Sequence, residues 1–212
     1  RLILTAALFV GVAGNAMATT INGSSLQGVL NNITVAPFGS SSVNVNTDQV
    51  AEGVDSTWAI SASGGSVSTF IIELAGFAAT NTFGIYNGSN TVEIFSGAAG
   101  AGSQTLISIL ADGSVIKNFV DTGVNFSGNN FGYYINTAPN GSIFYSDTSK
   151  NVDGFDHMVA FQGKGDTVQI LPYAAGIWGL GEYVLAFEDL SGGGDKDYDD
   201  MVIMVESVNP VG

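Results

Sequence analysis

The sequence predicts an all-β protein, an antiparallel, jelly-roll-like β-sandwich with little helix. Short runs rich in Val, Ile, Phe and Tyr recur along the 212 residues, and Gly, Asn and Asp separate them, which is the pattern of strands joined by turns. Only 11% of the residues are charged, so the Lys and Glu side chains that favour exposed helices are scarce. The 29 glycines supply turn positions. Together these observations favour a sandwich over a helical fold.

The composition limits the classes of partner. Nineteen Asp and Glu residues against five Lys and Arg residues give a formal net charge of −14. Nucleic acids and anionic membrane surfaces repel such a chain, so we expect neither as a partner. The absence of cysteine excludes disulfides and thiolate metal sites. A chain of this length is expected to form one domain.

Residues 1–18 have the pattern of a secretory signal peptide. Its three parts are the basic Arg1, an apolar run at 2–14 and a small-x-small sequence at 16–18. The apolar run is shorter than the roughly 20 residues that cross a bilayer. We therefore predict a secreted protein that begins at Thr19 and has no membrane span in its mature chain.

The rest of the chain divides into three parts. We expect residues 19–69 to be a β-rich N-terminal segment of the same sandwich, residues 70–208 to be its core with the two acidic loops described next, and residues 209–212 to begin a C-terminal linker. Asn87-Gly88 and Asp112-Gly113 predict hairpin turns within the core. The predicted strands before the acidic loops lie at 33–36, 42–45, 57–62, 70–74, 82–86, 91–95, 105–110, 115–120, 131–135 and 143–145.

A strand, an acidic loop and a second strand follow one another at 182–206. Six carboxylates lie in this loop, and Lys196 is the sole cation among them. Like charges repel, and Ca²⁺, which takes roughly six to eight oxygen ligands, would remove that repulsion. Glycines at 192–194 would let the backbone fold around the ion. We predict Ca²⁺ as the cofactor. The predicted ligands in this loop are Glu188, Asp189, Asp195, Asp197 and Asp200, with Asp199 as an additional candidate.

A second acidic loop at 147–157 precedes the apolar run 158–161. If this run pairs with the strand before the first loop, the two loops lie side by side and could share one ion or bind two neighbouring ions. The predicted ligands are Asp153 and Asp156, with Asp147 and Asn151 as additional candidates. His157 is the sole histidine, so hydrogen bonding to the ligands is favoured for it over zinc binding.

Four stretches of the sequence resemble a bacterial family of secreted domains of unknown function. They are FGIYNG at 83–88, FYSD at 144–147, NVDGFDHM at 151–158 and FEDLSGGGDKDYDDMVIMVESV at 187–208. Members of that family often precede a Pro-Glu-Pro (PEP-CTERM) sorting tail, which exosortase-type systems recognise. The resemblance therefore implies secretion, and residues 209–212 stand where a sorting tail would begin.

The resemblance also places the acidic positions of that family on both loops. Those positions are Glu188, Asp189, Asp195, Asp197 and Asp200 in one loop, and Asp153, Asp156 and His157 in the other. The family more often has Asn where Asp199 stands, so this chain carries an additional negative charge. The function of the family is not settled, and the resemblance supports secretion and calcium binding rather than an activity.

These observations favour a secreted, non-catalytic calcium-binding β-sandwich protein with a structural or adhesive role at the bacterial cell surface or in the extracellular matrix. An enzyme is disfavoured because no Gly-x-Ser-x-Gly sequence accompanies His157. One alternative is a calcium-dependent carbohydrate-binding module, in which Tyr173, Trp178 and Tyr183 would stack on an extracellular polysaccharide. Another is a self-assembling filament subunit, in which the β-prone segment 21–35 completes the sheet of another copy.

Overall fold

The computed structural model of the chain describes residues 18–72, 80–137 and 141–212. Apart from Ala18, the predicted signal peptide lies outside the described residues. Within them the chain consists mostly of antiparallel strands, which confirms the predicted all-β sandwich with little helix. No helix of this part of the chain has the length and apolar character needed to cross a membrane.

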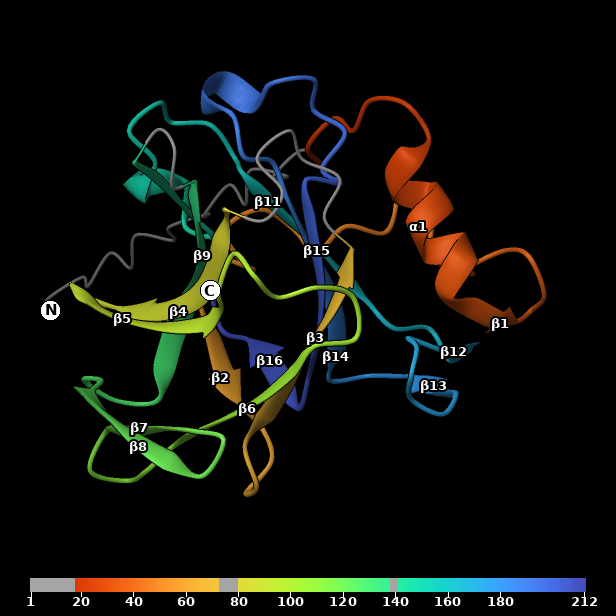
Figure 1. The fold of residues 1–212 in the computed structure, drawn as a ribbon. Helices are drawn as coiled ribbons and strands as arrows, with labels where there is room; N and C mark the ends of the chain where they lie inside the picture. The colour runs from red at the N-terminus through yellow and green to blue at the C-terminus, as the bar shows by residue number, and fades with distance from the viewer. Residues whose placement is uncertain (1–17, 73–79, 138–140) are drawn as a thin grey trace, which may run out of the picture.

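Three sheets account for the strands of the described residues (Figure 1). The seven-stranded sheet has the order β11 (Met158–Gln162), β14 (Glu182–Phe187), β15 (Met201–Glu206), β3 (Ser66–Ile72), β6 (Gln104–Ile109), β7 (Ser114–Lys117) and β8 (Val120–Asn125). The six-stranded sheet has the order β16 (Val208–Pro210), β2 (Trp58–Ile60), β9 (Asn130–Thr137), β4 (Thr82–Asn87) and β5 (Asn90–Phe95), and β10 (Ser142–Tyr145) also pairs with β9. The small sheet has the order β1 (Thr34–Ala36), β12 (Asp166–Val168) and β13 (Gly176–Trp178). The helices within the described ranges are α1 (Ser25–Ile33) and two short 3-10 helices, η1 (Thr148–Lys150) and η2 (Ser191–Gly193).

The two large sheets face each other across an inner core of aromatic and aliphatic side chains. The fully buried Trp58 of β2 makes an edge contact with Tyr183 of β14, with ring centroids 4.9 Å apart. Phe83 of β4 makes the same kind of contact with Phe187 of β14 at 5.9 Å. Each such pair contributes about 0.5–1.5 kcal/mol beyond the burial of its area. Both pairs join one sheet to the other, so they stabilise the sandwich directly.

A second, outer core lies on the opposite face of the seven-stranded sheet. Helix α1 covers part of it, and Figure 1 shows this helix on the side of β14 and β15 away from β4 and β5. Along β14, Leu185 enters the inner core and the next residue, Ala186, enters the outer core. Both faces of the strand are therefore covered. This explains why its sequence is continuously apolar, whereas a half-exposed strand would alternate.

The prediction of a β-prone segment at 21–35 is wrong for residues 25–33, which form α1. Its buried side chains have the spacing of one helical face, and they are Leu26, Val29, Leu30 and Ile33. The predicted strand at 42–45 does not form either. Gln27 of the helix donates from Nε2 to the carbonyl of Val43 at 3.0 Å, and its Oε1 accepts from the N–H of Val45 at 3.1 Å. These bonds satisfy backbone groups that a neighbouring strand would otherwise pair.

Two further segments differ from their predictions. The strand predicted at 115–120 is two strands, because Asn118 and Phe119 have φ angles of 49° and 67° and turn the chain between β7 and β8. Asn209 and Pro210, predicted to begin a linker, lie in β16 and pair with β2. The other predicted strands overlap observed ones, and the two predicted hairpin turns join β4 to β5 and β6 to β7.

Candidate metal centre

The acidic loop 188–200 joins two neighbouring strands of the seven-stranded sheet. Strands β14 and β15 pair as far as Phe187 and Met201, so the loop leaves and re-enters the sheet at adjacent positions. Strand β11 pairs with the other edge of β14, and the N–H of Glu188 donates to the carbonyl of His157 at 3.0 Å. The two acidic loops are therefore neighbours.

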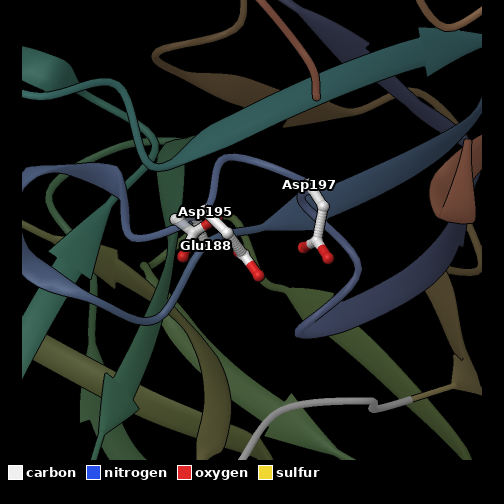
Figure 2. Close-up of side chains that lie close together, drawn as sticks. All are labelled: Glu188, Asp195 and Asp197. Carbon is white, nitrogen blue, oxygen red and sulfur yellow. The ribbon is translucent and has the colours of Figure 1, made fainter. Parts of the chain in front are cut away.

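Carboxylates of the loop 188–200 form three overlapping groups. Within each group, one oxygen from each residue lies within 4.8 Å of the others. The groups are Glu188 with Asp195 and Asp197, Glu188 with Asp189 and Asp200, and Asp197 with Asp199 and Asp200. Figure 2 shows the first group, with its three side chains gathered on the loop. The structure thus brings together all six carboxylates that the sequence analysis selected in this loop.

Glu188 is the residue that two of these groups share. Its side chain is 0% exposed, and neither Oε1 nor Oε2 has a hydrogen-bond donor among the described residues. Burial, followed by the nearby carboxylates of Asp200 and Asp195, raises the pKa of Glu188 well above its usual range. Removing a carboxylate from water without a partner costs several kcal/mol. A cation bound between these residues would offset that cost.

The pKa values of two neighbouring acids, Asp197 and Asp200, are raised as well. Burial raises the pKa of Asp197 from 3.8 to about 6. The adjacent carboxylates also raise this pKa, whereas a backbone hydrogen bond lowers it. The pKa of Asp200 is also raised, again mainly by burial. Lys196 does not relieve this repulsion, because its Nζ lies over the ring of Phe155, 5.2 Å from the ring centroid, and it forms no ion pair with the described residues.

The backbone of the loop approaches Glu188 closely. Gly194 has a φ angle of 40°, and a Cβ added there would lie 2.4 Å from Oε1 of Glu188. Only glycine allows this approach. Lys196 and Tyr198 have φ angles of 61° and 54°, a left-handed conformation that costs a non-glycine residue about 1–2 kcal/mol. The loop is thus held in an unfavourable conformation beside an unpaired carboxylate.

Asn81 is a site residue that the sequence analysis did not predict. It is 1% exposed, and its Nδ2 donates to Oδ2 of the buried Asp189 at 2.8 Å. Its Oδ1 has no hydrogen-bond partner, and amide oxygens are among the ligands that Ca²⁺ accepts. A single asparagine 108 positions before its partner has no local sequence pattern that would identify it.

Asp153 and His157 connect the two acidic loops. Oδ2 of Asp153 accepts hydrogen bonds from the N–H of Gly192 at 2.7 Å, from Oγ of Ser191 at 3.1 Å and from Nε2 of His157 at 2.9 Å. Burial raises the pKa of Asp153, but these hydrogen bonds outweigh it and hold the pKa below its usual range. Nδ1 of His157 donates to the carbonyl of Glu188 at 2.8 Å. Both ring nitrogens of His157 are thus engaged with oxygens of the protein.

The other candidates of the second loop have different surroundings. Asp147 precedes η1 and accepts from the N–H of Ser149 at 3.0 Å. Asn151 accepts from the N–H of Tyr145 at 2.8 Å. Asp156 accepts at Oδ1 from the N–H of Met158 at 3.2 Å. Neither these three residues nor Asp153 belong to the groups of the loop 188–200.

The three aromatic residues selected for sugar stacking do not share a surface. Trp178 is 0% exposed in the outer core, and its Nε1 donates to the carbonyl of Glu182 at 3.1 Å. Tyr183 is buried in the inner core, on the other face of the sheet. Tyr173 is 38% exposed. An aromatic ring must present a face to stack on a ligand, so these residues do not form the predicted platform.

The donor set of the loop 188–200 fits a hard divalent cation. Every donor in the three groups is a carboxylate oxygen, a set that suits Ca²⁺ or Mg²⁺ better than zinc or copper. Ca²⁺ tolerates irregular geometry and more ligands, whereas Mg²⁺ demands a near-octahedral arrangement and keeps several waters. Glu188, Asp195 and Asp197, with Asp189 and Asp200, would hold the ion. Such an ion would neutralise the repulsion between the carboxylates.

Comparisons with known proteins place the chain in a family whose function is not known. No curated protein and no solved structure matches the sequence. Residues 101–208, about half of the chain, match the family described as "Domain of unknown function (DUF4114)", and this range includes both acidic loops. The match agrees with the resemblance to a family of unknown function. The chain therefore belongs to the DUF4114 family of domains of unknown function.

Proposed function

We propose that this chain is a secreted, non-catalytic calcium-binding β-sandwich module with a structural or adhesive role at the bacterial cell surface or in the extracellular matrix. The observation that carries the proposal is the state of Glu188, a fully buried carboxylate without a hydrogen-bond donor, which two groups of acids share. Buried charges are normally paired or coordinate a metal. A bound Ca²⁺ would make Glu188 a ligand.

The proposed ion acts on the structure of the protein. It would lie where the loop 188–200 meets the ends of β14 and β15, and it would hold Gly194 and the aspartates against Glu188. His157 supports a structural role, because its two ring nitrogens contact one oxygen from each acidic loop, the carbonyl of Glu188 and the carboxylate of Asp153.

The chemistry of calcium and two features of the sequence support the proposed location outside the cell. Extracellular calcium modules bind with dissociation constants of about 10⁻⁴–10⁻³ M, so the loop would close after export. The pattern of a signal peptide at 1–18 and the resemblance to proteins with a PEP-CTERM sorting tail support this location. Under this proposal, export and the final step of folding are coupled.

Calcium is expected to raise the melting temperature of the purified chain. An ion that binds only the folded state at about 100 times its dissociation constant adds about 2.7 kcal/mol to the free energy of unfolding. For a domain of this size, that corresponds to roughly 5–10 °C. Scanning calorimetry in calcium and in excess chelator measures the shift, and magnesium at the same concentration controls for general charge screening. Equal melting temperatures in calcium and in chelator would count against the proposal.

The stability of the calcium-free protein is expected to fall as the pH rises. Glu188, Asp197 and Asp200 have raised pKa values, to about 6 for Asp197. The folded state therefore binds protons that the unfolded chain has already lost, and the free energy of unfolding decreases from about pH 4 through pH 6 and above. Calcium displaces those protons, so its stabilising effect is expected to be larger at about pH 8 than at about pH 5. Melting curves at both pH values, with calcium and with chelator, measure the difference; a calcium effect that is larger at the lower pH would contradict the assignment.

A further inference from the structure

Two groups of acids meet at Glu188, and they come from different parts of the same acidic loop. Asp195 and Asp197 form one group with it (Figure 2), and Asp189 and Asp200 form the other. Two oxygens that bind the same Ca²⁺ at about 2.5 Å lie at most about 5 Å apart. The members of each group satisfy that spacing, but no group of the described residues contains Asp195 together with Asp189 or Asp200. The side chains are therefore arranged as two sets of ligands that share Glu188.

Both carboxylate oxygens of Glu188 need a partner. The side chain is 0% exposed, and neither Oε1 nor Oε2 has a hydrogen-bond donor among the described residues. A single ion bound by both oxygens would satisfy Glu188, but it would leave one of the two groups without a cation. If each oxygen faces its own ion, as in two-metal sites with ions about 3.5–4 Å apart, both oxygens and both groups are satisfied.

Asn81 is independent evidence for a ligand beside Asp189 and Asp200. It is 1% exposed, and its Nδ2 donates to Oδ2 of Asp189 at 2.8 Å. Oδ1 of the same amide has no partner, although it is held beside this carboxylate. The N–H of Asp189 donates to Oδ2 of Asp200 at 2.9 Å, which fixes the position of the third side chain. A cation here would give the amide oxygen its partner, since Ca²⁺ accepts amide and carboxylate oxygens together.

The charge of the loop also favours two ions. One divalent cation would balance two of the negative charges on its six carboxylates, and two cations would balance four. The two ion pairs of the described residues involve no acid of this loop. The third group, Asp197 with Asp199 and Asp200, overlaps the other two and contains no buried oxygen that lacks a hydrogen-bond partner. It therefore gives no evidence for a third ion.

We propose that the loop 188–200 holds two neighbouring divalent cations, Ca²⁺ by the chemistry of the donors, and that Glu188 is a ligand of both. The ligands of the first ion are Glu188, Asp195 and Asp197, and those of the second are Glu188, Asp189, Asp200 and Asn81. The residue Asn81 directly precedes β4 of the six-stranded sheet, whereas the loop joins two strands of the seven-stranded sheet. The second ion therefore connects the two sheets. The pair rests on the proposed function, which itself requires only one ion.

The number of ions per chain tests the pair. Equilibrium dialysis against calcium, followed by metal analysis, gives this number for the wild-type chain and for single variants. Asp195→Ala removes a ligand from the first set alone, and Asn81→Leu removes the amide oxygen from the second set alone. Asp121→Ala and Asn129→Leu are the matched controls, because both residues are exposed and lie outside the acidic loops. Circular dichroism confirms that each variant is folded.

We expect the wild type and both controls to bind two ions, and Asp195→Ala and Asn81→Leu to bind one each at the same free calcium. A wild-type chain that binds one ion would refute the pair and leave the proposed function intact, whereas a chain that binds none would refute both. Folded Asp195→Ala and Asn81→Leu proteins that still bind two ions would show that the two sets are not the ligands.

Luminescence of lanthanide ions in place of calcium tests whether the two ions are neighbours. Energy transfer from bound Tb³⁺ to bound Eu³⁺ falls steeply with distance, so we expect it in the wild type loaded with both ions. We expect it to disappear in Asn81→Leu, which keeps one ion. Two bound ions without energy transfer in the wild type would place the ions apart and overturn the shared role of Glu188.

Discussion

Glu188→Gln is expected to abolish most of the increase in melting temperature that calcium gives the wild-type protein. The substitution keeps the volume of the side chain but removes the charge that two groups of carboxylates share. In chelator the variant is expected to melt above the wild type, because a buried amide replaces a buried carboxylate that has no donor. The mutation is therefore expected to raise the melting temperature in chelator and to lower it in calcium, a change of sign that a simple loss of packing would not produce. Scanning calorimetry of both proteins in calcium and in chelator measures both effects.

Glu93→Gln is the matched control for this variant. Glu93 is an exposed glutamate on β5, so the same chemical change occurs outside both acidic loops. We expect its melting temperature to respond to calcium as that of the wild type does. A Glu188→Gln protein that keeps the full calcium response would show that Glu188 is not a ligand.

Gly194→Ala is expected to prevent calcium binding while leaving every carboxylate in the sequence. The new Cβ would lie 2.4 Å from Oε1 of Glu188, and contacts below 3.0 Å force one of the groups to move. The backbone at this position also has a φ angle of 40°, which disfavours alanine. We expect the calcium affinity to fall at least about tenfold, equivalent to about 1.4 kcal/mol. Isothermal titration calorimetry measures the loss.

Gly192→Ala distinguishes the crowding at Glu188 from the general cost of alanine in this loop. Gly192 also has a positive φ angle, of 72°, but a Cβ added there meets nothing within 4 Å. Both variants should lose stability by roughly 1–2 kcal/mol through the left-handed backbone, and only Gly194→Ala should lose calcium. Equal calcium affinities in the two variants would show that the close approach of Gly194 to Glu188 is not needed for calcium binding.

Much of the fold could be predicted because local sequence determines it. Apolar runs such as those of β14 and β15 have the length and composition of strands that are buried on both faces, and both cores bury them. The failures occurred where a distant group decides the local structure. Gln27 bonds the backbone of 42–45 and replaces a strand partner, and the sequence of that segment does not contain this information.

The residues of the candidate site could also be predicted only in part. The carboxylates around Glu188 lie in one loop, so their density alone selected them. Asn81 reaches its position only through a tertiary contact with Asp189, and the sequence gives no pattern for it. Asp153, which the sequence selected as a ligand, accepts three hydrogen bonds at Oδ2, and its sequence neighbours do not reveal these contacts. Composition identifies the acids, whereas the direction of each carboxylate depends on the fold.

Strands β11, β14 and β15 contribute side chains to the inner and the outer core alike. Opening either core would expose one face of these three strands, so neither layer can melt while the other keeps its full stability. The layers thus form one cooperative folding unit. The loop 188–200 begins and ends on two of the shared strands. An ion that stabilises the folded loop would therefore raise the free energy of unfolding of the whole sandwich.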